Sequence, residues 1–182
     1  DAATRCRYNR WTGAVATQIA RTLQVEAPVE KGWSILADDY ATIGDWARAV
    51  EQSAANPDAA PLPGAAVGGR VCTANIGEVT ETITTFDPKF HVLAYQAKAK
   101  AMPFFVRGLT GRWTLETAQG GTRVDLGFKA DLIPPFGTLM GWAMKRQFAT
   151  AIDETLEDLK LWAETGQVHP DKAKALAAGT RN

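Results

Sequence analysis

Residues 134–166 read PPFGTLMGWAMKRQFATAIDETLEDLKLWAETG, and this stretch decides the fold. Apolar residues recur through it at helical spacing, and charged residues such as Lys145, Asp153 and Glu157 lie on the other side. The apolar row consists of Met140, Met144, Phe148, Ile152, Leu156 and Leu159. Prolines precede the pattern and Gly166 stops it. The stretch predicts one amphipathic helix over 136–165, about 45 Å long, with its apolar row against a sheet.

The segments before this helix alternate apolar and polar residues, which is typical of half-buried β-strands. Strands are expected at 16–26, 70–75, 78–86, 91–100, 106–116 and 122–132, with a weaker candidate at 49–54. Turn residues such as Gly77 and Asp87-Pro88 separate them. Two short helices are expected after the first strand, one beginning near Pro28 and one over 42–46. A weak helical pattern at 171–178 follows the long helix.

Short landmarks in the sequence lie at matching places in this order of elements. They read APVEKGW at 27–33, IGDW at 43–46, TETITTFDP at 80–88 and GGTRV at 120–124. With them the chain resembles the START, polyketide cyclase and Bet v 1-like (SRPBCC) superfamily, and within it the bacterial polyketide cyclase/dehydrase branch. The resemblance implies an α+β helix-grip fold, in which a curved antiparallel sheet wraps around a long C-terminal helix. It also implies a superfamily of cyclases, lipid and quinone carriers, hormone receptors and subunits without known chemistry.

One domain is expected to account for most of the chain. At 182 residues the protein is long enough to build a full core without disulfides or a structural metal. We expect the helix-grip domain at 16–166, preceded by an N-terminal arm at 1–15 and followed by a polar C-terminal tail at 167–182. The arm combines Arg5, Arg7 and Arg10 with Tyr8 and Trp11, which suits contact with a protein partner.

Charge and composition exclude several classes of protein. The chain has 20 Lys and Arg residues against 20 Asp and Glu, so its formal net charge is zero. This predicts no long-range attraction to nucleic acid or to anionic lipid, and nucleic acid is not expected as a partner. No apolar run approaches the roughly 20 residues that a membrane-spanning helix needs. The start at Asp1 without Met leaves open a bacterial cytoplasm or an organelle reached by a targeting peptide.

Familiar catalytic and metal-binding motifs are absent from the sequence. It contains no GxGxxG after a strand, no P-loop, no HExxH and no GxSxG. His91 and His169 are too few and too far apart to suggest a metal site, because zinc needs three or four converging ligands. Cys6 and Cys72 do not form a disulfide framework. We therefore expect neither a metal nor a cofactor.

What remains is the interior between the sheet and the long helix, where an apolar pocket can form. Alternation along the strands and the row on the helix predict its lining. The predicted ligand-binding residues are Glu81, Tyr95, Arg107, Trp113, Phe128, Met140, Met144 and Phe148. Most of this lining is apolar, which favours a hydrophobic ligand.

Two charged residues occupy positions that alternation assigns to the apolar face. Glu81 lies between Val79 and Ile83, and Arg21 lies between Ile19 and Leu23. An inward charge needs a partner. Either these residues contact a ligand's carbonyl or hydroxyl, with Tyr95 as a proton donor, or they form a structural ion pair, or the alternation is shifted by one residue. Glu81, Tyr95 and Arg21 are the candidate catalytic residues.

Three functions follow from these observations, and the sequence leaves open whether the protein is an enzyme. The first is binding or transport of a hydrophobic small molecule, such as a lipid, quinone or polyketide-like compound, in an internal cavity. The second is a polyketide cyclase or dehydrase that uses Glu81, Tyr95 or Arg21. The third is a non-catalytic accessory subunit that docks on a larger complex through residues 1–15 and 167–182.

Overall fold

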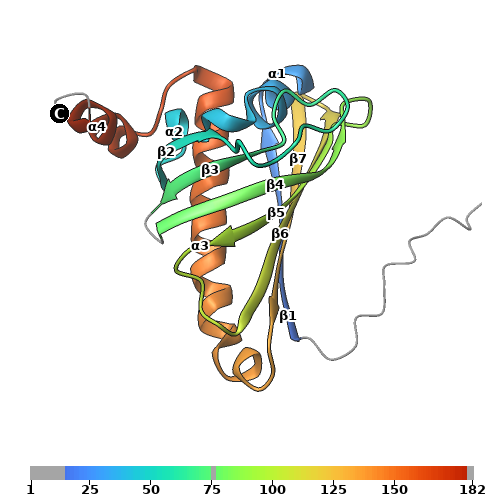
Figure 1. The fold of residues 1–182 in the computed structure, drawn as a ribbon. Helices are drawn as coiled ribbons and strands as arrows, with labels where there is room; N and C mark the ends of the chain where they lie inside the picture. Colours follow the sequence, from blue (N-terminus) through green and yellow to red (C-terminus); the bar gives the residue numbers. More distant parts are fainter. Residues whose placement is uncertain (1–14, 75–76, 180–182) are drawn as a thin grey trace, which may run out of the picture.

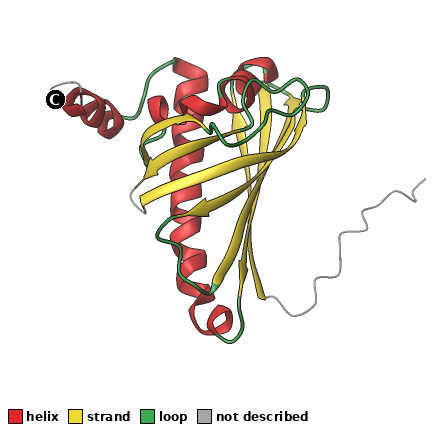
Figure 2. Ribbon diagram, viewed as in Figure 1, coloured by secondary structure: helices red, strands yellow, loops and turns green. Residues whose placement is uncertain are grey.

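The computed structural model of the protein describes residues 15–74 and 77–179. Within these residues seven antiparallel strands form one curved sheet in the order β1-β7-β6-β5-β4-β3-β2, and the helix α3 runs along its inner side (Figures 1 and 2). In chain order the elements are β1 Val15–Val25, α1 Val29–Trp33, η1 Ser34–Asp38, η2 Tyr40–Thr42, α2 Ile43–Trp46, β2 Val50–Ala55, β3 Gly69–Ala74, β4 Gly77–Asp87, β5 Val92–Ala99, β6 Val106–Ala118, β7 Gly121–Leu132, α3 Phe136–Thr165 and α4 Pro170–Gly179. This is the helix-grip architecture that the sequence predicts.

The element boundaries agree closely with the hydrophobic pattern. Helix α3 covers the predicted residues, every strand lies within two residues of its expected range, and the weaker strand candidate is β2. The difference lies between α1 and α2, where the chain forms a π-helical turn, η1, and a short 3-10 turn, η2. These turns bring Tyr40 into the core, where its side chain is fully buried.

Side chains on the inner face of the sheet form rows that cross the strands. One row consists of Leu93, Trp113, Leu126 and Arg21; the next of Ile83, Tyr95, Gly111, Phe128 and Ile19; and the third of Arg70, Glu81, Ala97, Leu109, Ala130 and Thr17. The first row is mostly bulky, whereas the third contains alanines and a threonine. On β5, β7 and β1 the inner-face side chains are therefore smaller in the third row than in the first.

The C-terminal segment returns to the sheet after α3. Gly166 adopts φ 68°, a left-handed conformation that glycine accepts without strain, and ends the helix. In α4 the buried Lys172 donates from Nζ to the backbone oxygen of Val50 in β2 at 2.5 Å. His169, just before α4, lies 3.4 Å from the guanidinium of Arg48. Residues 169–172 are thus held on the domain by polar contacts.

Gly111 makes room for the ring of Tyr95. The two residues are paired across β5 and β6, and a Cβ atom at position 111 would overlap the phenol ring and its hydroxyl. A side chain there would push Tyr95 out of its buried position, because the neighbouring core is close-packed. Gly127 in β7 is different, since nothing lies within 4 Å of a Cβ added there.

We therefore expect Gly111→Ala to destabilise the protein by about 1–3 kcal/mol, which is typical of an overpacked core. Gly127→Ala is the matched control and should leave the free energy of unfolding nearly unchanged. Urea unfolding of both variants, followed by circular dichroism, measures the difference. Equal stability of the two variants would mean that Tyr95 does not occupy the space above Gly111.

Candidate functional site

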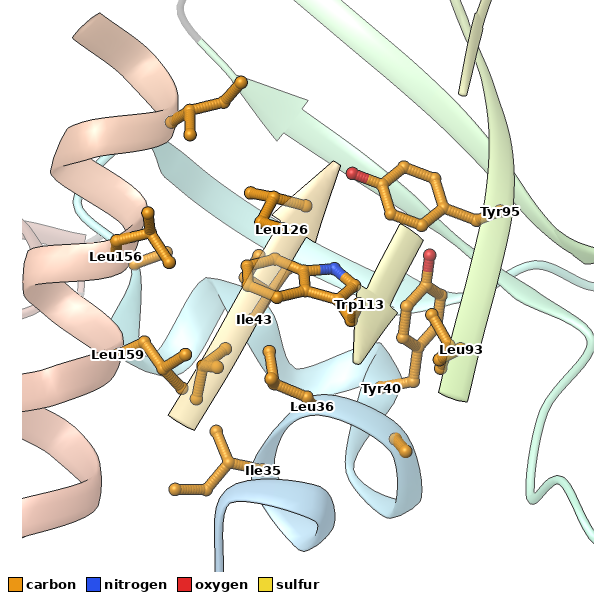
Figure 3. Close-up of a cluster of buried hydrophobic side chains, with 14 of the residues drawn as sticks. Ile35, Leu36, Tyr40, Ile43, Leu93, Tyr95, Trp113, Leu126, Leu156 and Leu159 are labelled. Carbon is orange, nitrogen blue, oxygen red and sulfur yellow. The ribbon is translucent and has the colours of Figure 1, made fainter. Parts of the chain in front are cut away.

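The C-terminal half of α3 forms the packed end of the molecule. Ile152, Leu156, Leu159 and Ala163 are buried in the main hydrophobic cluster. Figure 3 shows Leu156 and Leu159 facing side chains from the segment between α1 and α2 and from the sheet, among them Ile35, Leu36, Ile43, Trp113 and Leu126. The short helices close this end, so large side chains fill the space between helix and sheet.

The N-terminal half of α3 borders a groove instead. The groove has a volume of about 540 Å³ and runs between α3 and the ends of the short strands β2 and β3. Its lining residues are Ala49, Ala74, Trp142, Ala143, Arg146, Gln147, Thr150, Ala151 and Glu154. Alanines supply much of the wall and leave the space empty, while the polar side chains come from the helix.

Apolar side chains on the inner faces of α3 and β7 remain partly exposed in this half. The rings of Phe128 in β7 and Phe148 in α3 pack together with their centroids 5.1 Å apart, and both are half-buried. Met144, one turn before Phe148, is half-buried as well. These three predicted lining residues therefore lie on the inner side, where solvent still reaches them. The side chain of Met140 lies outside the described part of the structure.

Glu81 lies in a buried polar cluster with Arg70 and Tyr40. Arg70 and Glu81 are paired across β3 and β4, and Arg70 Nε lies 2.8 Å from Glu81 Oε2 in an ion-pair contact that lacks hydrogen-bond geometry. The hydroxyl of Tyr40 donates to the same Oε2 at 2.5 Å. Arg70 also donates from Nη1 to the backbone oxygen of Tyr40 at 3.0 Å, and its guanidinium lies 4.2 Å from the centre of the Tyr40 ring. Arg70 and Glu81 therefore both bind Tyr40 as well as each other.

Burial controls the protonation of the groups around this cluster. It raises the pKa of Tyr40 well above its ordinary value, and it raises the pKa of Tyr95, with the negative charge of Glu81 adding to both shifts. It also raises the pKa of the Cys72 thiol to about 11. Burial opposes the charge of Arg70, but Glu81 outweighs it and the net effect raises the pKa of Arg70. The phenols and the thiol are therefore neutral near pH 7, and Arg70 is charged.

Tyr95 is the group of this region that extends toward the helix. Its ring centroid is 6.3 Å from that of Tyr40, and its hydroxyl points to the α3 side in Figure 3. A neutral phenol donates a hydrogen bond but does not act as a base. The side chain is nevertheless buried and is not among the residues that line the groove.

Arg21 lies on the inner side of β1 but away from Glu81. Its guanidinium forms a two-point ion pair with Asp153 of α3, at 2.6 and 3.2 Å. The two side chains are about 38% and 48% exposed. Of the alternatives left open by the sequence, a structural ion pair describes the contacts of both Arg21 and Glu81, and neither residue is turned outward by a shifted alternation.

None of the predicted lining residues whose side chains the structure describes is among the residues that line the groove. Two of them also differ from the prediction in their surroundings. Arg107 is exposed, because the pairing of β6 with β7 shifts between Val106 and Gly108 and reverses the alternation at that point. The expectation that Arg107 faces inward is therefore wrong. Trp113 does face inward, but it is buried between Leu93 and Leu126 at the packed end.

The sequence analysis missed Arg70, Tyr40 and the groove residues Trp142, Arg146 and Glu154. Arg70 opposes Glu81 only because of the register between β3 and β4, which the sequence pattern does not fix. Tyr40 reaches the cluster through the π-helical turn. The groove residues occupy the side of α3 that the helical pattern assigns to solvent. Ala49 and Ala74 lie across the groove from them, and their small side chains leave the space open.

Two negative findings apply to the described residues. Residues 15–74 and 77–179 contain no group of three or more His, Cys, Asp and Glu side chains arranged to hold a metal ion. No helix in the same part of the chain is long and apolar enough to cross a membrane.

Solved structures share this fold at low sequence identity. A point mutant of norcoclaurine synthase from Thalictrum flavum, in complex with a transition-state analogue, superposes with a TM-score of 0.60 at 15% identity, over 84% of this chain and 97% of that one. A protein from Nitrosospira multiformis gives 0.61 at 14% identity, over 82% and 98% of the two chains. The structure of Ara h 8.0201 gives 0.58 at 12% identity, over 80% and 98%. These identities establish the fold alone.

The order of the elements and the curved sheet around α3 define a Bet v 1-like helix-grip domain. No curated protein matches the sequence. The model of one family, described as polyketide cyclase/dehydrase and lipid transport, matches residues 16–164, and the chain belongs to that family. This agrees with the resemblance stated from the sequence.

The polar cluster predicts a large loss of stability when its charges are unbalanced. Glu81→Gln leaves the guanidinium of Arg70 buried without a counter-charge, which typically costs about 3–5 kcal/mol. The double variant Arg70→Met, Glu81→Gln removes both charges and should recover part of that loss. Arg123→Ala, which breaks exposed ion pairs with Glu116 and Asp125, should cost less than about 1 kcal/mol. Urea unfolding of all three variants tests the cluster, and a loss for Glu81→Gln no larger than for Arg123→Ala would contradict it.

The raised pKa of Cys72 predicts slow alkylation. In a Cys6→Ser background, native Cys72 should react with iodoacetamide at pH 8 about a hundredfold more slowly than a free thiol, because the thiolate is the reactive form. The neutral thiol is favoured in the folded state, so this contribution to stability is complete below pH about 9 and is lost as the pH rises through about 11. Mass spectrometry measures the rate, and urea should restore free-thiol reactivity. Reaction of the native protein at the free rate would show that the thiol is accessible.

Proposed function

We propose that the protein binds a hydrophobic small molecule between the N-terminal half of α3 and the inner face of the sheet. The observation that carries this proposal is the groove of about 540 Å³ between α3 and the strands β2 and β3. This volume lies in the range of roughly 300–1,000 Å³ that is typical of small-molecule sites. The packed C-terminal half of α3 confines the ligand to the other half.

The lining favours a ligand with an apolar body and a polar end. Ala143, Ala151 and Trp142 contribute apolar surface to the groove. Phe128 and Phe148 pack together on the inner faces of β7 and α3 and are half-buried. Apolar surface that stays wet in the free protein is stabilised when a ligand covers it. Arg146 and Glu154 give the groove one charge of each sign, which suits a polar group at its rim. A lipid, a quinone or a polyketide-like molecule meets this description.

Binding without chemistry has more support than catalysis. The carboxylate of Glu81 accepts the Tyr40 hydroxyl and faces the guanidinium of Arg70, so its strongest acceptor positions are already used. A general base must instead reach the proton that it removes. Tyr95 is neutral near pH 7 and serves as a hydrogen-bond donor. Tyr95 is buried over Gly111 and does not line the groove. We therefore assign Tyr95 and the Arg70–Glu81 pair to structure.

Filling the groove should weaken binding. We expect the protein to bind the fluorescent amphiphile 1-anilinonaphthalene-8-sulfonate saturably, with one site per chain. Ala151→Trp places an indole in the groove and should raise the dissociation constant at least about tenfold, equivalent to roughly 1.4 kcal/mol. Ala175→Trp, an equal change at an exposed position of α4, should leave it unchanged.

Fluorescence titration of the three proteins measures these constants, and native mass spectrometry of protein purified gently from its source identifies the natural ligand. Absence of saturable binding, or equal affinity in Ala151→Trp and the wild type, would refute the proposed site. A bare chain held in a larger complex would favour the accessory-subunit alternative instead.

A further inference from the structure

One end of the molecule exposes large apolar side chains. Phe104, Leu139 and Trp142 are 75%, 69% and 72% exposed. Phe104 belongs to the loop between β5 and β6, whereas Leu139 and Trp142 are one turn apart on α3. In the described part of the chain only Phe90 and Leu176 are comparable, and each belongs to a different segment. We call the surface of Phe104, Leu139 and Trp142 the apolar end.

Contacts at the base of these segments place them together. The amide of Ile133 donates to the backbone oxygen of Phe105 at 2.8 Å, which ties the β5–β6 loop to the residues that lead into α3. A Cβ at Gly141 would lie 3.8 Å from Leu132 and 3.6 Å from Thr17, so this part of α3 lies against the ends of β7 and β1. In Figure 1 the loop and the start of α3 both lie at the lower end of the sheet.

Basic side chains surround the apolar end. Lys98, Lys100 and Arg107 lie on β5, the loop and β6, and Lys145 and Arg146 follow on α3; all five are exposed. None of the five has an ion-pair partner among the described residues, although most other basic residues there do. Unpaired charges contribute little to the fold and remain free to attract an anionic partner.

Acidic residues are correspondingly scarce at this end. The part of α3 over 136–150 contains no Asp or Glu, whereas 151–165 contains Asp153, Glu154, Glu157, Asp158 and Glu164. Near the loop, Asp131 forms an ion pair with Lys129 at 2.8 Å. Glu78, at the start of β4, is a second acidic residue close to the loop, since its backbone oxygen accepts from the amide of Lys100. The net charge of zero therefore hides a positive end and a negative end.

A second hollow lies among these basic residues. It has a volume of about 240 Å³ and is lined by Gln96, Ala97, Lys98, Arg107, Gly108, Leu109, Thr110 and Asp131. Lys98 and Arg107 lie on its wall together, because the shift in pairing after Val106 turns Arg107 outward. Two cations beside one small hollow are suited to an anionic headgroup such as a phosphodiester.

We propose that the apolar end docks on the surface of an anionic lipid bilayer. Apolar side chains that enter the headgroup region, together with Lys and Arg at its level, are the two components of interfacial membrane binding. The basic residues supply the attraction, and Phe104 and Leu139 supply the apolar insertion. Trp142 belongs both to this end and to the groove, so docking places the groove opening at the membrane. This inference goes beyond the proposed function, since binding in the groove does not require a membrane.

Vesicle flotation with the full chain tests the proposal. The wild type should float with vesicles of equal parts phosphatidylcholine and phosphatidylglycerol, and much less with phosphatidylcholine alone. Raised salt should reduce the bound fraction, because it screens exposed charges. The variant Lys100→Glu, Phe104→Ser should lower the partition coefficient at least about tenfold, since it reverses one charge and removes one apolar anchor.

The matched control lies at the other end of the sheet. Lys89 and Phe90 occupy the turn between β4 and β5, and Phe90 is 63% exposed. Lys89→Glu, Phe90→Ser makes the same chemical changes there and should leave vesicle binding as in the wild type. Failure of the wild type to bind the anionic vesicles, or an equal loss in both double variants, would overturn the proposal.

Leu139→Ser provides a second test that leaves the loop intact and should also reduce binding. Circular dichroism and thermal unfolding establish that each variant is folded. Sedimentation of the wild type and the loop variant tests whether a second copy of the chain covers the apolar end instead. A wild-type dimer that dissociates in the variant would overturn membrane docking. The fluorescence titration in the groove is independent of the membrane, so a wild type that binds the probe but does not bind anionic vesicles refutes the docking surface alone.

Discussion

The structure depends on one geometric constraint, which is that a single helix has to cover a seven-stranded sheet. A helix is about 10 Å across, whereas strands about 4.8 Å apart make a sheet of this size roughly 30 Å wide. Helix α3 therefore packs mainly along β1, and the sheet must curve to bring β2 and β3 toward its other side. At one end α1, η1, η2 and α2 fill the remaining space. At the other end no described element does so, and the groove is the result.

The buried ion pair follows from the same constraint. The short segments that fill the packed end need a fixed position on the sheet, and Tyr40 supplies it. Its hydroxyl donates to Glu81, its ring lies under the guanidinium of Arg70, and its backbone oxygen accepts from Arg70. Replacing a buried pair by apolar groups is often neutral for stability, so such pairs contribute more to the choice of one arrangement than to its free energy. Here the arrangement chosen keeps η2 at the packed end.

The sequence predicted what depends on periodicity and missed what depends on register. Helix α3 and the strands follow from repeats of apolar residues, which side-chain burial enforces along each element. Alternation also placed Glu81 and Tyr95 on the inner face. It misplaced Arg107, because the irregular pairing between Val106 and Gly108 adds a residue that no local pattern reveals. Arg70 is the partner of Glu81 because of the register between β3 and β4, and the pattern of a single sequence does not determine that register.

The net charge, like the alternation pattern, does not record where residues lie in space. A sum of zero argues against attraction to anionic surfaces only when the two signs are mixed, because fields are set by local arrangement. In this chain several basic residues of the packed half form ion pairs, as with Arg48 and Asp158 at 2.9 Å and Lys160 and Glu164 at 2.5 Å. The exposed basic residues near the start of α3 are left without such partners among the described residues. The same half of α3 that leaves the groove open therefore also carries the positive field, and a ligand with an anionic head would meet both features at one end.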